Sequence, residues 1–238
     1  MPLELTFVPG TMCDRRLWAP VWRALDAPIA DGRMAPRYIA VETRLTREAI
    51  RAAFDEAAER GPLNLIGFSM GGYLSLEYAL DHPERVASLI VVCSSSYGLS
   101  EAEKAERAKV VAFLETHAYR GISTSRLNLF VHPGKQADTE VTDTIRAMDR
   151  DLGQPVLLAQ MRETTRRASL TERLGALTCP TLLIGADEDR LVRWDHIAEM
   201  HARLPHSRLE QAHAAGHMLP LEQPDWLAAR IADFHGLG

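Results

Sequence analysis

The segment Gly67-Phe68-Ser69-Met70-Gly71 combines a nucleophilic side chain with the backbone freedom needed to expose it. An apolar run enters the segment and a helical pattern leaves it, which predicts a tight turn between a strand and a helix. A serine in such a turn adopts strained φ and ψ angles, and only residues with almost no side chain fit two positions before and after it. Ser69 is therefore the candidate nucleophile, and Gly67 and Gly71 are predicted to be steric requirements.

A serine hydroxyl becomes a good nucleophile only when a base takes its proton, and that base needs an acid to orient it. His217 is the candidate base, because it follows Gly216 in a loop after the last predicted strand. His213 is its nearest competitor, and it lies close to the end of that strand. The acid is expected in the loop after the preceding strand, where Asp189 is the first choice and Asp187 the alternative. Spacing alone does not decide between them, because it does not determine the geometry of a loop.

The first predicted strand ends in another glycine turn, Pro9-Gly10-Thr11-Met12. Acyl transfer requires backbone N–H groups that stabilise the developing oxyanion, and Gly10 lets the backbone approach a carbonyl closely. We expect the N–H groups of Thr11 and Met70 to form an oxyanion hole, with the N–H of Met12 as the alternative to that of Thr11. An ordinary turn between a strand and a helix is the simpler interpretation of this loop taken alone.

Hydrophobic periodicity predicts six short strands separated mainly by helices. The strands begin near residues 3, 37, 63, 87, 181 and 207, and residues 26–36 are predicted to be a loop. The nearly continuous apolar run over residues 86–93 is typical of a parallel strand that is covered on both faces. With 238 residues, of which 46% are hydrophobic, the chain fits one α/β domain with an insertion.

Residues 97–170 show helical patterns without intervening strands. An all-helical insertion cannot take part in the alternation of strands and helices, so we expect it to form a cap over the strand ends and over Ser69. The core domain is then predicted to comprise residues 1–96 and 171–238. Four apolar residues are candidate substrate contacts, namely Met12, Phe130, Met161 and Met218.

The predicted cap also contains a basic cluster of Arg162, Arg166 and Arg167. The first two are four residues apart and share a helix face. One hypothesis is that this face steers an anionic substrate group, such as a carboxylate or the phosphopantetheine of an acyl-carrier partner. The competing interpretation is a solvated helix face.

Composition excludes several classes of protein. A net charge of −5 provides no basic surface for nucleic acid or an anionic membrane, and no apolar run is long enough to span a bilayer. The first residues lack the pattern of a signal peptide, so we expect a cytoplasmic location. Three cysteines without C-x-x-C spacing argue against a disulfide framework and against a zinc site, and Cys13 is a weaker candidate nucleophile than Ser69. We expect no metal or organic cofactor, because the acid, the base and the oxyanion donors are complete without one.

Nearly the whole chain resembles the α/β-hydrolase superfamily, and particularly its small capped serine esterases. The matching residues are Pro9 to Met12, Gly67 to Gly72, Asp189 to Val192, and Gly216-His217 with Glu222 and Pro224. The order Ser, Asp, His is that of the family's triad. The resemblance implies a mostly parallel sheet of about six strands with a helical cap. The chain departs from the pattern in having Pro9 where many members have histidine and Arg193 where proline is common. It also begins at the strand that is usually third of eight, so the first antiparallel pair is expected to be absent.

The resemblance implies a serine esterase that acts on a small-molecule ester or thioester with an apolar acyl group. Serine at position 69 argues against dehalogenase and epoxide hydrolase chemistry, for which relatives carry aspartate. Relatives use the same triad for carbon–carbon bond hydrolysis, perhydrolysis and lyase or synthase reactions, which remain alternatives. A ligand receptor with the hydrolase fold and little turnover is the alternative from a different class. The sequence does not predict the oligomeric state.

Overall fold

The computed structural model describes residues 1–238 and contains one sheet of six strands in the order β2-β1-β3-β4-β5-β6. The strands are β1 (Leu3–Val8), β2 (Met34–Tyr38), β3 (Leu63–Phe68), β4 (Val86–Val92), β5 (Thr181–Ala186) and β6 (Ser207–Ala212). Every neighbouring pair is parallel, so all six carboxyl ends lie at one edge. The predicted fold class is confirmed.

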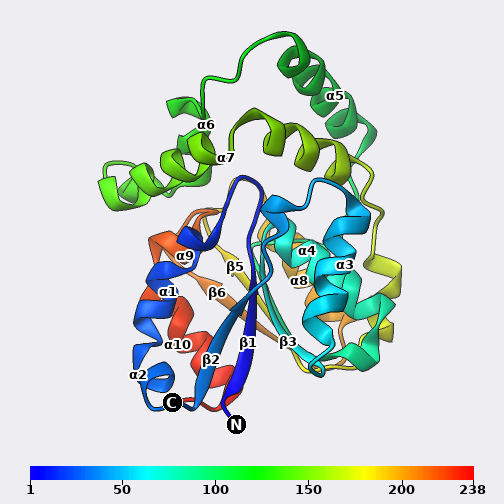
Figure 1. Cartoon of the computed structure of the whole chain (residues 1–238), viewed down its shortest axis with the longest axis vertical. Helices are drawn as coiled ribbons and strands as arrows, with labels where there is room; N and C mark the ends of the chain where they lie inside the picture. Colours follow the sequence, from blue (N-terminus) through cyan, green and yellow to red (C-terminus); the bar gives the residue numbers. More distant parts are fainter.

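Helices cover both faces of this sheet (Figure 1). One face carries α1 (Ala19–Ala24) and α10 (Pro224–His235), and the other carries α3 (Arg47–Ala58), α4 (Met70–Asp81) and α8 (Trp194–Arg203). Alternate strand residues point to opposite faces. Phe7 accordingly belongs to the hydrophobic cluster with α1 and α10, whereas the next residue, Val8, belongs to the cluster with α3, α4 and α8. The sheet is thus buried on both sides, as the apolar run of β4 predicted.

The segment before β3 differs from the prediction. Residues 26–36 are not a loop, because they contain the short helix α2 (Asp26–Ala30) and the start of β2. The strand begins at Met34 and includes Pro36, which has no backbone N–H to donate. Proline is tolerated here because β2 is an edge strand and pairs only with β1. Pro36 favoured the prediction of a loop, and the first half of β2 was therefore missed.

Between β4 and β5 the chain forms helices and no strand. The three α-helices are α5 (Glu101–Thr116), α6 (Thr124–Phe130) and α7 (Thr139–Thr165). Ser100 and Glu103 form a capping box at the start of α5. Gly153, with φ 67°, interrupts α7 and divides it into two halves. All three helices lie beyond the carboxyl ends of the strands (Figure 1).

The first half of α7 is packed onto the core. Its buried residues Val141, Ile145 and Met148 belong to the same hydrophobic cluster as β1 and α1. The remaining connections are short helical turns, namely η1 (Arg15–Leu17), η2 (Val41–Thr43), η3 (Pro83–Arg85), η4 (Pro133–Lys135), η5 (Thr171–Ala176) and the four-residue α9 (Leu219–Glu222). None of the helices combines the length and the apolar character that crossing a membrane requires.

Candidate active site

Ser69 occupies the turn between β3 and α4, with φ 50° and ψ −116°. Backbone strain of this kind costs on the order of 1–3 kcal/mol and persists only where the surroundings enforce it. A Cβ on Gly67 would lie 2.5 Å from the carbonyl oxygen of Gly71, and a Cβ on Gly71 would lie 2.4 Å from that of Pro9. Both contacts are with backbone, which cannot move aside easily. The steric requirement predicted for the two glycines is confirmed.

The structure brings together Ser69, His217 and Asp189, which are far apart in the sequence. The Ser69 hydroxyl lies 2.9 Å from Nε2 of His217, and Nδ1 of His217 lies 2.8 Å from Oδ2 of Asp189. The carboxylate requires Nδ1 to carry the proton, so Nε2 accepts a hydrogen bond from the serine hydroxyl. The side chains of His217 and Asp189 are 5% and 0% exposed. The geometry therefore joins a hydroxyl, an unprotonated imidazole nitrogen and a buried carboxylate in series.

Asp189 and Asp187 have different partners. Oδ1 of Asp189 accepts hydrogen bonds from the N–H groups of Leu191 and Val192, at 2.8 and 3.0 Å, and this leaves Oδ2 directed at His217. Asp187 instead lies 3.1 Å from Nδ1 of His213, which is mostly exposed. Of the two candidate acids, only Asp189 contacts the imidazole next to Ser69, and His213 contacts the other.

Glu222 holds the loop that carries His217. The sequence motif included Glu222 but did not predict which groups it contacts. Oε2 of Glu222 accepts hydrogen bonds from the N–H groups of Gly216, at 3.0 Å, and of His132, at 2.9 Å. Burial raises the pKa of the Glu222 carboxyl despite these bonds. Because His132 lies two residues after the end of α6, this one side chain connects the imidazole loop to the helical insertion.

The backbone N–H groups of Thr11, in the loop after β1, and of Met70, the first residue of α4, have no hydrogen-bond partner in the chain. The helix N-terminus adds a partial positive charge at the second of them. The N–H of Met12 is occupied, because it donates to Oε1 of Gln160 in α7 at 2.9 Å. Gln160 was not predicted, since no sequence pattern pairs residues that are 148 positions apart.

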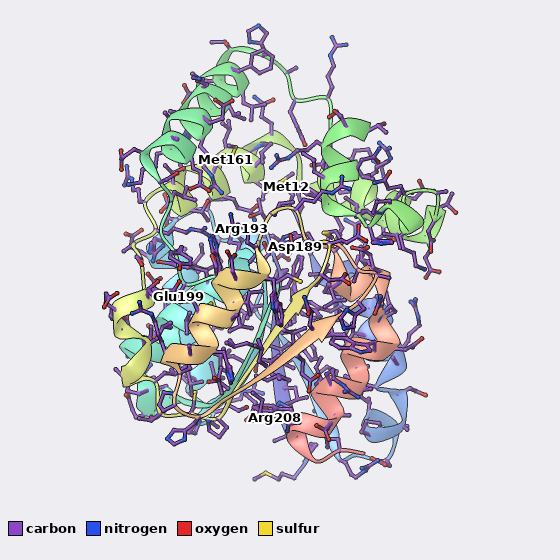
Figure 2. The ribbon with its side chains drawn as sticks, turned by 180° about the vertical axis from the view of Figure 1, so that it is seen from behind. Met12, Met161, Asp189, Arg193, Glu199 and Arg208 are labelled. Carbon is purple, nitrogen blue, oxygen red and sulfur yellow. The ribbon has the colours of Figure 1, made fainter.

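The four candidate substrate contacts differ in their surroundings. Phe130 lies beside the imidazole, with its ring centroid 6.2 Å from that of His217. Met12 and Met161 come from the core and from α7, respectively, and lie between the cap helices and the sheet edge that carries Asp189 (Figure 2). Met218 is only 3% exposed and belongs to the hydrophobic cluster on the α1 face, so it contributes packing.

The three cysteines are free and buried. Burial raises the pKa of the Cys13 and Cys93 thiols, so both remain protonated and are poor nucleophiles. No group of three or more His, Cys, Asp or Glu side chains is arranged to hold a metal ion.

Together, the fold and this site define a known class of protein. A family profile described as the alpha/beta hydrolase fold matches residues 31–224. The chain belongs to the α/β-hydrolase family, as the sequence motifs predicted.

Individual relatives support the assignment to this family. The chain is 30% identical over 184 residues to an uncharacterized hydrolase, YugF, of Bacillus subtilis (strain 168), a match that covers 71% of this chain and 64% of that protein. It is 28% identical over 185 residues to a putative 2-succinyl-6-hydroxy-2,4-cyclohexadiene-1-carboxylate synthase of the same strain, covering 72% of this chain and 65% of the relative. The match thus spans slightly less than two thirds of the length of each relative. The structure of a thermophilic esterase from Thermogutta terrifontis has a TM-score of 0.83 and 23% identity, covering 99% of this chain and 90% of the other, which shows a shared fold.

Proposed function

We propose that the protein is a serine hydrolase that cleaves a carboxylic ester or thioester through an acyl-enzyme. The observation that carries the proposal is the unbroken series of hydrogen bonds from the Ser69 hydroxyl through His217 to the buried Asp189 carboxylate. A buried carboxylate in contact with Nδ1 orients the imidazole and stabilises the imidazolium that forms when the serine loses its proton.

The reaction then proceeds in two halves. Ser69 Oγ attacks the substrate carbonyl while Nε2 of His217 takes the hydroxyl proton. The carbonyl π electrons move to oxygen, and collapse of this oxyanion expels the alcohol or thiol, which receives the proton from His217. Water attacks the acyl-enzyme in the same way, with His217 first as base and then as acid. The products are the free acid and the regenerated Ser69.

The oxyanion requires donors that have no other partner, and Thr11 and Met70 supply them. The N–H group that follows the nucleophile is the usual first donor in this fold, and the loop after β1 supplies the second. Thr11 is preferred to Met12, because the N–H of Met12 is bonded to Gln160. We propose that Gln160 is a positioning residue, which holds the loop so that the N–H of Thr11 faces the carbonyl.

Replacing Gln160 with leucine is expected to lower kcat by about ten- to hundredfold with little change in KM, because a small displacement of an oxyanion donor acts on the transition state. A suitable control is Gln154→Leu, since Gln154 Oε1 also accepts a backbone N–H, that of Tyr119, at 2.7 Å within the cap. Both variants should lose thermal stability, and only Gln160→Leu should lose kcat. Equal kcat values in the two variants would contradict the positioning role.

Turnover of p-nitrophenyl acetate tests the proposed function directly. We expect steady release of p-nitrophenol well beyond one equivalent per protein molecule. A single burst or no release would favour a receptor with the hydrolase fold. The similarity to a putative synthase supports a second candidate, a lyase or synthase that uses the same triad. Esters and thioesters of graded chain length distinguish these candidates, with Ser69→Ala measuring the background rate. A hydrolase should cleave them with a kcat that varies with chain length, whereas a lyase or synthase should not.

A further inference from the structure

Arg107 and Arg167 lie close to each other near the junction of the cap and the core, and neither has an acidic partner. Arg107 is in α5, and its guanidinium donates a hydrogen bond to the Thr164 hydroxyl of α7 at 2.6 Å. Burial, and next the charge of Arg167, lower the pKa of Arg107. Most other arginines of the chain form ion pairs, for example Arg173 with Asp81 at 2.7 Å. Two like charges that share a half-buried region without a counterion are destabilising unless something else supplies one.

Arg167 lies above the helix that begins at the nucleophile. Its guanidinium carbon is 5.3 Å from the ring centroid of Tyr73, which is one turn after Ser69 in α4. The Nε atom of Arg167 is buried and has no hydrogen-bond partner. Burial lowers the pKa of this guanidinium as well. The Nε–H of Arg167 is therefore a strong donor that no group of the chain accepts.

Arg126 brings a third positive charge from α6. Its guanidinium carbon lies 4.9 Å from the ring centroid of Phe130, and Phe130 packs beside His217. The charge of Arg126 also lowers the pKa of Arg107. Contacts with aromatic rings thus link Arg126 to the His217 side of the active site and Arg167 to the helix that follows Ser69.

Burial lowers the pKa of both Arg107 and Arg167, and one acidic residue, Glu103, acts to raise it, but its carboxylate is hydrogen-bonded elsewhere. Glu103 accepts hydrogen bonds from the N–H and the hydroxyl of Ser100, at 2.8 and 2.7 Å, in the capping box of α5. It forms no ion pair with either arginine. The single carboxylate of Glu103 therefore leaves an excess of positive charge on Arg107 and Arg167. A planar guanidinium is well suited to bind an oxyanion through two hydrogen bonds.

We infer that Arg107, Arg126 and Arg167 form an anion subsite, and that the substrate carries a carboxylate or phosphate group at the end remote from the bond cleaved by Ser69. This inference rests on the proposed function, because Ser69 fixes where the reacting carbonyl lies. The subsite differs from the basic face that the sequence suggested, which was formed by Arg162 and Arg166. Arg162 is exposed and bonded to Glu115, which agrees with a solvated face, and Arg166 is exposed.

Two esters of equal chain length test the inference, namely mono-p-nitrophenyl glutarate, which ends in a carboxylate, and p-nitrophenyl valerate, which ends in a methyl group. Arg107→Gln and Arg167→Gln should each raise KM for the glutarate ester about tenfold or more and change KM for the valerate ester less than about twofold. Arg126→Gln should act in the same direction with a smaller effect, because Arg126 is more exposed. Arg166→Gln is the matched control and should change neither KM.

Parallel changes for the two esters, or none, would overturn the subsite. If Arg107→Gln or Arg167→Gln does not fold, Arg167→Lys and the exposed Arg126→Gln give the same comparison. Lysine keeps the charge and loses the planar fork, so Arg167→Lys should retain part of the preference for the charged ester.

Calorimetric titration of Ser69→Ala with glutarate and with inorganic phosphate tests binding without turnover. Binding of glutarate that is lost in Ser69→Ala/Arg107→Gln would support a carboxylate ligand, and the same result for phosphate alone would support a phosphate. Failure of both anions to bind would overturn the subsite.

The two proposals can fail separately. If the wild type does not turn over esters and glutarate still binds in a manner that depends on Arg107, the proposed hydrolase function fails and the subsite stands. If neutral esters turn over and neither anion binds, only the subsite fails.

Discussion

The Ser69→Ala variant is expected to lose about four to six orders of magnitude in kcat for p-nitrophenyl esters, with an unfolding temperature close to that of the wild type. The substitution removes the attacking oxygen and leaves the Asp189–His217 contact in place. Alanine and serine tolerate the strained φ of this turn about equally, and the glycine contacts that enforce the turn are unchanged. Steady-state kinetics together with circular dichroism melting measure the two quantities.

Ser75→Ala is an appropriate control for this variant. Ser75 lies in the same helix, is fully buried, and its hydroxyl has no hydrogen-bond partner, so its removal should leave kcat unchanged. Undiminished turnover by Ser69→Ala would exclude Ser69 as the nucleophile and with it the proposed mechanism.

The Asp189→Asn variant is expected to lower kcat by about ten-thousandfold, whereas Asp187→Asn should lower it less than about tenfold. An asparagine at 189 can still accept the N–H groups of Leu191 and Val192 through its carbonyl oxygen. Its NH₂ group would then face Nδ1 of His217 and favour the tautomer whose Nε2–H cannot take the serine proton. Kinetics of both variants on one ester decide the matter, and comparable mild losses would mean that neither carboxylate orients the base.

Asp187 should instead affect stability in a pH-dependent way. Burial alone would raise its pKa, but hydrogen bonds from the N–H of Ala214, from His213 and from the N–H of Ala215 lower it below the usual value. A carboxyl with a lowered pKa in the folded state contributes stability above its usual pKa of about 3.9, and this contribution is lost as the pH falls through the folded-state value. The difference in unfolding temperature between the wild type and Asp187→Asn should therefore be present at neutral pH and should decrease below about pH 4.

The sequence predicted best those features that a local steric rule determines. The turn at Ser69 is one example, because the positions of Gly67 and Gly71 follow from backbone clearance alone. The choice between Asp187 and Asp189 was harder, because both follow β5 and only the turn formed by the N–H groups of Leu191 and Val192 directs one of them toward His217. For β2, the local signal of Pro36 favoured a loop, and its pairing with β1 outweighed that signal.

Contacts between the cap and the core were beyond the reach of sequence patterns. The bond from Met12 to Gln160 depends on how the second half of α7 lies over the loop after β1. The basic residues show the same limitation. Helical spacing grouped Arg162 with Arg166. In the folded chain Arg167 lies just beyond the end of α7, beside the ring of Tyr73, and its charge acts on Arg107 of α5. Spacing identifies which residues share a helix face, but it does not identify what that face contacts.

The close approach of Gly71 to the carbonyl groups of Val8 and Pro9 has a consequence for how new specificities can arise in this protein. The loop that carries Thr11 and the helix that begins at Met70 are in contact through main-chain atoms. A Cβ on Gly71 would lie 2.5 Å from the Val8 oxygen and 2.4 Å from the Pro9 oxygen, so only glycine permits this contact. Side chains contribute little to this backbone contact, so substitutions on the surface of the cap leave it unchanged. Libraries that randomise cap residues other than Gln160 should therefore yield many variants with altered substrate preference and an unaltered rate of bond cleavage on small esters. Libraries that include position 71 should yield almost none.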